Sequence, residues 1–194
     1  MRVNETFLSL QGEGHFTGTP AFFLRLSGCN LQCPFCDTSH QSYMKMSEDE
    51  IVEEASSHKP RHIVITGGEP ALQLTQSLVD KLHEAGFFIQ VETNGTLPLP
   101  EGIDWVTASP KSSPIREDLK INELKVLFMG DGTDPEASLL GGRFGGGLVR
   151  LYLQPLDTGN EEQNRIILRD TIAYILEHPK WSLSLQTHKM LGIK

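Results

Sequence analysis

Short apolar runs alternate along this chain with polar, helix-like segments, a pattern that few folds accommodate. Strand character is found at residues 20–28, 61–66, 87–93, 103–109, 123–128, 149–154 and 181–187, and helical patterns at 47–58, 74–86 and 161–177. Such alternation is typical of a parallel α/β sheet. An eightfold barrel needs about 250 residues, whereas this chain has 194. We therefore predict an α/β fold, a partial TIM-like barrel of about six parallel strands, in one domain spanning 1–194.

Local signals mark the ends of several of these segments. Ser47 and Glu50 have the spacing of a capping box, in which each side chain bonds the backbone N–H of the other residue at the start of a helix. Gly86 ends the helical pattern at 74–86. The glycine-rich segment 130–147 lacks the phosphate-binding pattern G-x-x-x-x-G-K-[ST]. We predict that this segment is a flexible surface loop.

Composition narrows the class of protein. The formal net charge of -8 argues against a nucleic-acid surface, which is normally basic. No apolar run is long enough to cross a bilayer, and the first residues lack the basic region and apolar stretch of a signal peptide. We therefore expect a soluble, cytoplasmic protein with reduced thiols that acts on a small molecule, without a nucleic-acid or membrane partner.

The three cysteines of the chain, Cys29, Cys33 and Cys36, all lie in the string CNLQCPFC. The spacing C-x3-C-x2-C lets three thiolates from one loop converge on an inorganic centre. A [4Fe-4S] cluster normally takes four cysteines, so a cluster held here would leave one iron open to a small molecule. The competing interpretation is a structural zinc site, in which His40 would complete a Cys3His tetrahedron.

Further motifs follow the predicted strands. They are TGGEP at 66–70, ETNG at 92–95, SPK at 109–111 and QPLD at 154–157. Sites in parallel α/β folds gather at the carboxyl ends of the strands, so we expect these motifs and the cysteine string to share one site. In TGGEP the paired glycines permit close backbone approach, and Glu69 offers a carboxylate to an ammonium group. A tight turn before the next helix explains the same residues.

The cysteine string and TGGEP resemble the signature motifs of radical S-adenosylmethionine (SAM) enzymes, in which an aromatic residue, here Phe35, precedes the third cysteine. The resemblance implies a [4Fe-4S] cluster on Cys29, Cys33 and Cys36. SAM would bind the open iron through its amino and carboxylate groups, and an electron delivered through the cluster would cleave it to a 5′-deoxyadenosyl radical. An electron donor such as flavodoxin or ferredoxin is implied as a partner.

Further motifs, distributed from one end of the chain to the other, indicate one family within this superfamily. LQGEG, CDTSH, ITGGEPALQL, VETNGT, SPK, NELKV, LQPLD and LSLQTHK closely resemble the 7-carboxy-7-deazaguanine synthase family. This resemblance implies ring contraction of 6-carboxy-5,6,7,8-tetrahydropterin to 7-carboxy-7-deazaguanine with loss of ammonia. The reaction is that of a carbon-nitrogen lyase in the biosynthesis of the queuosine precursor. The resemblance also implies Mg²⁺ as a cofactor and a homodimer.

The resemblance also assigns roles to matching residues. The residues expected at the substrate are Leu10, Gln11, Gly12, Arg25, Thr66 and Lys194, and a guanidinium fork such as that of Arg25 suits a substrate carboxylate. The residues expected at SAM are Phe35, Cys36, Asp37, Gly68, Glu69, Glu92, Ser109, Pro110, Lys111, Gln154, Pro155, Leu156 and Asp157. Glu92 would meet the ribose hydroxyls, or serve in a cap or salt bridge. Thr38 would bind Mg²⁺, although chemistry alone favours Asp37.

Other interpretations stay open at this point. Glu13 and His188 are candidates for proton transfer. A radical SAM activase that acts on a protein partner would share the cysteine string and the GGEP sequence, but it has no need of LQGEG and CDT. A non-enzymatic zinc module would be colourless and would keep its metal in air.

Overall fold

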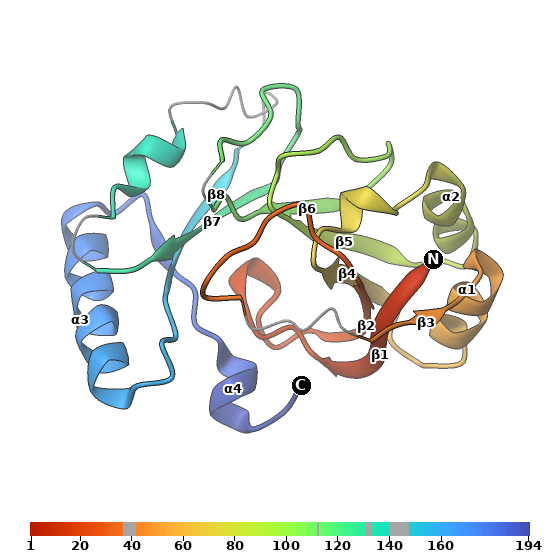
Figure 1. Ribbon diagram of the computed structural model, residues 1–194, viewed down its shortest axis with the longest axis horizontal. Helices are drawn as coiled ribbons and strands as arrows, with labels where there is room; N and C mark the ends of the chain where they lie inside the picture. The colour runs from red at the N-terminus through yellow and green to blue at the C-terminus, as the bar shows by residue number, and fades with distance from the viewer. Residues whose placement is uncertain (37–41, 112, 131–132, 140–147) are drawn as a thin grey trace.

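The computed structural model describes residues 1–36, 42–111, 113–130, 133–139 and 148–194. Within these residues the strands form one sheet of nine in the order β3-β1-β2-β4-β5-β6-β7-β8-β9 (Figure 1). Their bounds are β1 Arg2–Leu10, β2 Pro20–Leu26, β3 Met44–Lys45, β4 His62–Gly67, β5 Phe88–Thr93, β6 Trp105–Ala108, β7 Glu123–Phe128, β8 Arg150–Pro155 and β9 Ser182–Leu183. The α-helices are α1 Glu48–Ser56, α2 Gln76–Glu84, α3 Glu161–Glu177 and α4 Thr187–Leu191. Short 3-10 helices lie at η1 Gly14–Phe16, η2 Pro70–Leu72 and η3 Pro135–Leu139.

The sheet is open, and most of its strands are parallel. From β2 through β4 to β9, each strand pairs in parallel with the next. At the other edge, β1 pairs antiparallel with β2 and with β3. In the order given, β3 and β9 are the two edge strands, so the barrel does not close. The predicted partial TIM-like barrel is confirmed, with an antiparallel edge added to it.

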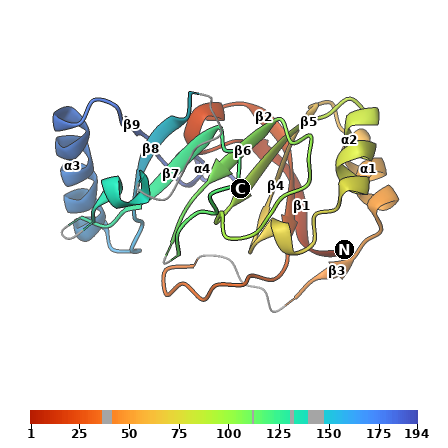
Figure 2. The same ribbon diagram turned by 90° about the horizontal axis from the view of Figure 1, so that it is seen from above.

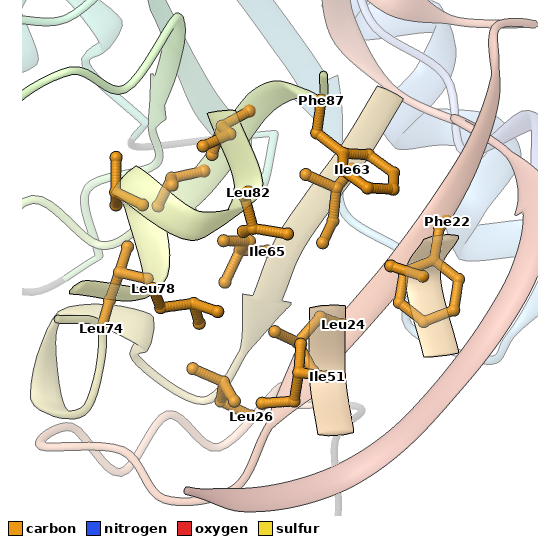
Figure 3. Packing of buried hydrophobic residues seen from close by; sticks show 14 of the residues in the cluster. Phe22, Leu24, Leu26, Ile51, Ile63, Ile65, Leu74, Leu78, Leu82 and Phe87 are labelled. Atoms are coloured by element: carbon orange, nitrogen blue, oxygen red, sulfur yellow. The ribbon is translucent and has the colours of Figure 1, made fainter. Parts of the chain in front are cut away.

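The two faces of the sheet have different environments. Side chains alternate between the faces of a strand, and Phe22, Leu24, Leu26, Ile63 and Ile65 all point to the helical side and are fully buried. Figure 3 shows them packed against residues of the helices, namely Ile51 of α1 and Leu78 and Leu82 of α2. The other face of the same strands is therefore free to carry the polar side chains described below.

A second apolar layer lies at the far end of the sheet. Figures 1 and 2 show α1 and α2 at one end and α3 at the other. Leu124 of β7 and Leu153 of β8 are fully buried in the cluster that includes Ile167 of α3 and Trp181.

Across the described residues, none of the helices combines the length and the apolar character that a membrane crossing requires.

The helix signals read from the sequence hold, with small changes at the ends. The capping box at Ser47 is confirmed, since its Oγ accepts from the Glu50 N–H at 3.2 Å and Glu50 Oε2 accepts from the Ser47 N–H at 2.7 Å. The helix predicted at 74–86 begins at Gln76, because Thr75 is its N-cap. Gly86 follows it with a φ of 80°, a conformation that favours glycine.

Two predicted segments differ from the structure. The strand predicted at 181–187 is reduced to Ser182–Leu183, and its last predicted residue, Thr187, is the first residue of α4. In the segment 130–147, residues 131–132 and 140–147 lie outside the described residues. The described part is not a loose loop, because it contains η3. Glu136 of η3 accepts from Trp181 Nε1 at 3.0 Å and pairs with Lys180 at 2.5 Å, so this part is held against the segment after α3.

Candidate functional site

A cavity of about 310 Å³ lies on the face of the sheet opposite α1 and α2. That volume lies in the range of small-molecule sites. Its walls include most of the residues that the sequence predicted for one site: Leu10, Gln11, Gly12, Arg25, Phe35, Cys36, Thr66, Gly68, Glu92, Ser109, Lys111, Gln154, Leu156, Asp157 and Lys194. The parallel strands thus bring the separate motifs to one place, as expected for strand ends in an α/β fold.

Some predicted site residues do not line this cavity. Glu69, Pro110 and Pro155 are absent from its walls, although their neighbours in each motif are present. Asp37 and Thr38 lie outside the described residues, as does His40, so the structure places neither the predicted Mg²⁺ ligand nor the fourth zinc ligand.

The three cysteines lie along one wall of the cavity. Cys29, Cys33 and Cys36 all line it and form no disulfide, and the Cys36 N–H donates to the Cys33 carbonyl at 3.1 Å, which closes a short turn. Among the described residues, no three metal-ligating side chains stand together at ligand spacing. The donor set nevertheless fits a [4Fe-4S] cluster with one open iron, because it supplies three thiols, one fewer than such clusters normally take.

The TGGEP loop packs backbone to backbone against the start of the cysteine loop. The Gly68 N–H donates to the Leu26 carbonyl at 3.1 Å, and the Glu69 N–H donates to the Gly28 carbonyl at 2.9 Å. A Cβ on Gly68 would lie 2.1 Å from the Gly28 oxygen. Only glycine permits this approach. Because both loops also line the cavity, they form one continuous wall of it.

This close approach predicts the effect of Gly68→Ala. Because the clash is with backbone, we expect the loop to shift, stability to fall by about 1–3 kcal/mol, and SAM affinity to fall at least tenfold. Gly86→Ala is the control, since a Cβ there meets nothing within 4 Å and costs only the strain of its φ. Urea unfolding and SAM titration measure the two effects. Unchanged SAM binding by Gly68→Ala would show that the tight contact is not needed.

Glu69 supports the loop from behind the cavity wall. Its side chain is fully buried. Oε1 accepts from Thr93 Oγ1 at 2.7 Å and from the Ala71 N–H at 3.0 Å, and Oε2 accepts from the Asn94 N–H at 2.7 Å. The predicted contact with the SAM ammonium group stays a prediction, and the hydrogen bonds support a role in tying the TGGEP loop to the end of β5.

A buried ionic cluster forms another wall. Lys125 Nζ lies 2.5 Å from Glu13 Oε2 and 2.9 Å from Glu92 Oε2. The Lys125 side chain is 6% exposed. Burial would raise the pKa of Glu13, but the charge and hydrogen bond of Lys125 hold it at about 2. With so low a pKa, Glu13 is a weak base, which disfavours it as the proton-transfer group considered from the sequence.

The end of the cavity near β1 carries two cations that share one carboxylate. Arg25 pairs with Glu5 at 3.0 Å, directly across the β1–β2 ladder, and Lys194 Nζ pairs with Glu5 at 2.6 Å. Burial acts against ionisation, yet hydrogen bonds and charges of Lys194 and Arg25 lower the pKa of Glu5. The stacked rings of Phe7 and Phe23, 4.9 Å apart, form the adjoining apolar surface. This end is suited to a flat ligand with a carboxylate.

The comparisons with known proteins agree with this geometry. Residues 24–114 match the family model of the Radical SAM superfamily. The chain is 45% identical to a 7-carboxy-7-deazaguanine synthase of Bacteroides thetaiotaomicron, over 100% of this chain and 98% of that protein. It is 40% identical to the Caulobacter vibrioides protein of the same name, over 98% of each. The chain belongs to the 7-carboxy-7-deazaguanine synthase family. It also matches the crystal structure of QueE from Escherichia coli, with a TM-score of 0.77, 31% identity, and coverage of 95% of this chain and 92% of that one.

Membership of this family makes the protein a radical SAM enzyme, which implies a [4Fe-4S] cluster and SAM as cofactors. The non-enzymatic zinc module considered from the sequence is therefore wrong. The three thiols, the Gly68 backbone and the SPK and QPLD strand ends lie on the walls of one cavity. That arrangement would allow the chain to hold a cluster and a nucleoside cofactor in one site.

Lys125 lines the cavity but was not among the site residues that the sequence motifs predicted. It lies in β7, whose sequence ELKVLF places Glu123 and Lys125 at alternate positions of an apolar run. Both are buried, at 1% and 5% exposure. Charged residues are rarely buried unless they are paired, so this pattern was the signal that could have found them. It did not reveal the partners, which come from the loop after β1 and from β5.

The environment of Glu123 predicts that the stability of the fold depends on pH. Burial and the charge of Glu92 raise its pKa to about 7, against the opposing charge of Lys125. Between its ordinary value of 4.5 and 7, the unfolded chain loses this proton while the folded chain keeps it, so the group destabilises the fold increasingly as pH rises. We expect Glu123→Gln to be more stable than the unchanged protein at pH 8, by about 1–3 kcal/mol, and equal to it near pH 4.

Urea unfolding at several pH values measures this difference. Glu136→Gln is the opposite control, because hydrogen bonds from Lys180 and Trp181 lower the pKa of Glu136, and that variant should lose stability at neutral pH. A Glu123→Gln protein that is less stable at pH 8 would mean that Glu123 is ionised in the folded protein and that its charge strengthens the bond it accepts from the His15 N–H, 3.0 Å away.

Proposed function

We propose that this enzyme converts 6-carboxy-5,6,7,8-tetrahydropterin to 7-carboxy-7-deazaguanine with release of ammonia, a step in queuosine-precursor biosynthesis. The observation that carries the proposal is one cavity lined both by the thiols of Cys29, Cys33 and Cys36 and by Arg25 and Lys194. Relatives of nearly the same length bear the name of this synthase. The reaction is redox-neutral, since substrate minus ammonia has the composition of the product.

At the cofactor side, Cys29, Cys33 and Cys36 would hold the cluster. The Gly68 backbone, the SPK and QPLD motifs and Glu92 would hold SAM. When bound, the cluster and SAM supply the one-electron chemistry that removes a hydrogen atom from carbon. The chain itself binds, orients and excludes water. Asp157 contributes by fixing the QPLD turn, because it accepts from the Gly159 N–H at 3.0 Å and pairs with Lys189 at 2.8 Å.

At the substrate side, Arg25 would bind the substrate carboxylate with its guanidinium fork. Phe7 and Phe23 would support the flat ring system, and Thr66 and Gln11 would hydrogen-bond to its edge. Arg25 is held ready by Glu5 at 3.0 Å, so the incoming carboxylate would share this cation with Glu5. Thr38 as a ligand of Mg²⁺, a flavodoxin-like or ferredoxin-like donor and a homodimer complete the proposal.

The test is product formation after anaerobic cluster reconstitution. The protein is incubated with SAM, dithionite, Mg²⁺ and 6-carboxytetrahydropterin, and the products are read by mass spectrometry. We expect 7-carboxy-7-deazaguanine. SAM cleavage without this product would leave a radical SAM enzyme with a different substrate, such as an activase. Omission of Mg²⁺ tests that cofactor, and the proposal expects a lower rate without it.

A further inference from the structure

Lys125 occupies a position that a purely structural role does not explain. It extends from β7 into the cavity and meets carboxylates from two other parts of the chain, Glu13 after β1 and Glu92 at the end of β5. Its neighbours in β7 on the opposite face, Leu124 and Val126, are buried in the apolar cluster under α3. Replacing a buried ion pair by apolar side chains of similar volume is often neutral or stabilising, so stability alone gives no reason for these charges.

Each carboxylate is also held on its second oxygen. Glu13 Oε1 accepts from Gln186 Nε2 at 2.9 Å, and Glu92 Oε1 accepts from Gln90 Nε2 at 2.9 Å and from Gln11 Nε2 at 3.3 Å. A carboxylate has about four acceptor positions. The protein therefore fixes the orientation of both groups and leaves them with capacity to accept further hydrogen bonds from a ligand.

The charge of Lys125 keeps both carboxylates in the acceptor form. Both lie within hydrogen-bond distance of Lys125 Nζ, so without that cation two negative groups would face each other in a partly buried wall. The other charged or titratable groups that act on this cluster are Lys111, His188 near Glu13, and Glu123 near Glu92. Like charges at such a distance lead the pair to bind a proton. A protonated carboxyl group becomes a hydrogen-bond donor and would oppose a ligand that itself presents donors.

We propose that Lys125 is a positioning residue that holds Glu13 and Glu92 as a fixed pair of ionised acceptors for the N–H and O–H groups of the bound ligands. The ribose hydroxyls of SAM would meet Glu92, and a donor edge of the second ligand would meet Glu13. The inference rests on the proposed function for the identity of the second ligand only. The part that concerns SAM rests on family membership and on the proposed contact of Glu92 with SAM.

The experiment compares Lys125→Met, Lys125→Arg and the double variant Lys125→Met with Glu13→Gln, each reconstituted with the cluster. SAM affinity is measured by titration from pH 6.5 to 9, and thermal unfolding is followed by circular dichroism. Lys81→Met is the matched control, because Lys81 also bridges two carboxylates, Glu48 at 3.4 Å and Asp49 at 2.6 Å, but on the surface.

We expect Lys125→Met to weaken SAM binding at least tenfold at pH 7 and to recover part of that loss at pH 9, where the shared proton leaves. Lys125→Arg keeps the positive charge, and the double variant removes one charge of each sign. Both should therefore bind SAM more tightly than Lys125→Met at pH 7. Lys81→Met should match the unchanged protein. The proposal would be overturned if Lys125→Met lost no SAM affinity, or lost the same amount at every pH. It would also be overturned if the double variant bound SAM no more tightly than Lys125→Met. If Lys125→Met does not fold, the double variant is compared with the unchanged protein: SAM affinity within tenfold of that protein supports the proposal, and a larger loss overturns it.

Failure of this inference is distinct from failure of the proposed function. An unchanged protein that binds SAM but makes no deazapurine would refute the substrate assignment and leave the role of Lys125 at Glu92 to be judged by the SAM titrations. Product formation by Lys125→Met with unchanged SAM affinity and unchanged KM for the pterin would refute the inference and leave the function standing.

Discussion

Replacing any one of Cys29, Cys33 and Cys36 by serine is expected to lower activity at least a thousandfold while leaving the fold intact. The reason is that the chain has no other cysteine to replace a lost ligand, and a cluster with three protein ligands has none to spare. Cys29 and Cys36 are exposed and Cys33 is partly exposed, so no core packing is lost. Substitutions at such positions usually change stability by about 0.5 kcal/mol or less.

The measurement combines iron and sulfide content, the visible spectrum and product formation, with urea unfolding of the metal-free protein as the control for folding. The expected result is loss of cluster and product without a change in the unfolding midpoint. A serine variant that keeps a full cluster and measurable turnover would show that another group ligates the iron, and the assignment of three thiolates would be wrong.

The second large effect is expected for Arg25→Met. Arg25 is the guanidinium on the cavity wall that faces Glu5 at 3.0 Å, with its charge 5.8 Å from the Phe7 ring centroid. Loss of one partner of a buried charge pair typically costs about 2–5 kcal/mol in binding. We therefore expect kcat/KM for the pterin to fall about 100-fold or more, mainly through KM. SAM affinity should be unchanged, because the proposed SAM contacts lie at other strand ends.

Two further variants sharpen this test. Arg25→Lys keeps the charge but loses the bidentate fork, so its KM for the pterin should lie between those of the unchanged enzyme and Arg25→Met. Arg61→Met is the matched control, because Arg61 also lies over a phenylalanine ring, that of Phe87 at 5.2 Å, but on the surface. An Arg25→Met enzyme with an unchanged KM would place the substrate carboxylate elsewhere, and Lys194 would be the next position to test.

The sequence predicted those parts of the fold that depend on local patterns. Apolar strand-like runs, helical patterns and strand-end motifs are local properties, and they led to the open parallel sheet and to most of the cavity walls. The capping box at Ser47 follows from two residues three apart and is confirmed. The antiparallel pairing of β1 with β2 was not predicted, because pairing between strands depends on register rather than on either strand alone.

The parts of the site that could not be predicted depend on that register. Glu5 lies opposite Arg25 only because of the β1–β2 register. Lys125 meets Glu13 and Glu92 only because β7 and β5 lie on either side of β6 and the loop after β1 reaches the same wall. The motif at Glu69 predicted the right loop, but the direction of its side chain comes from hydrogen bonds to the end of β5.

The central claim is that this cavity brings a radical SAM centre to a carbon atom of the pterin. The most direct measurement uses 6-carboxytetrahydropterin with deuterium at C6, incubated anaerobically with the reconstituted enzyme, SAM, Mg²⁺ and reductant. We expect deuterium in the 5′-deoxyadenosine or the recovered SAM, together with 7-carboxy-7-deazaguanine. Formation of 5′-deoxyadenosine without deuterium, and without the deazapurine, would contradict it.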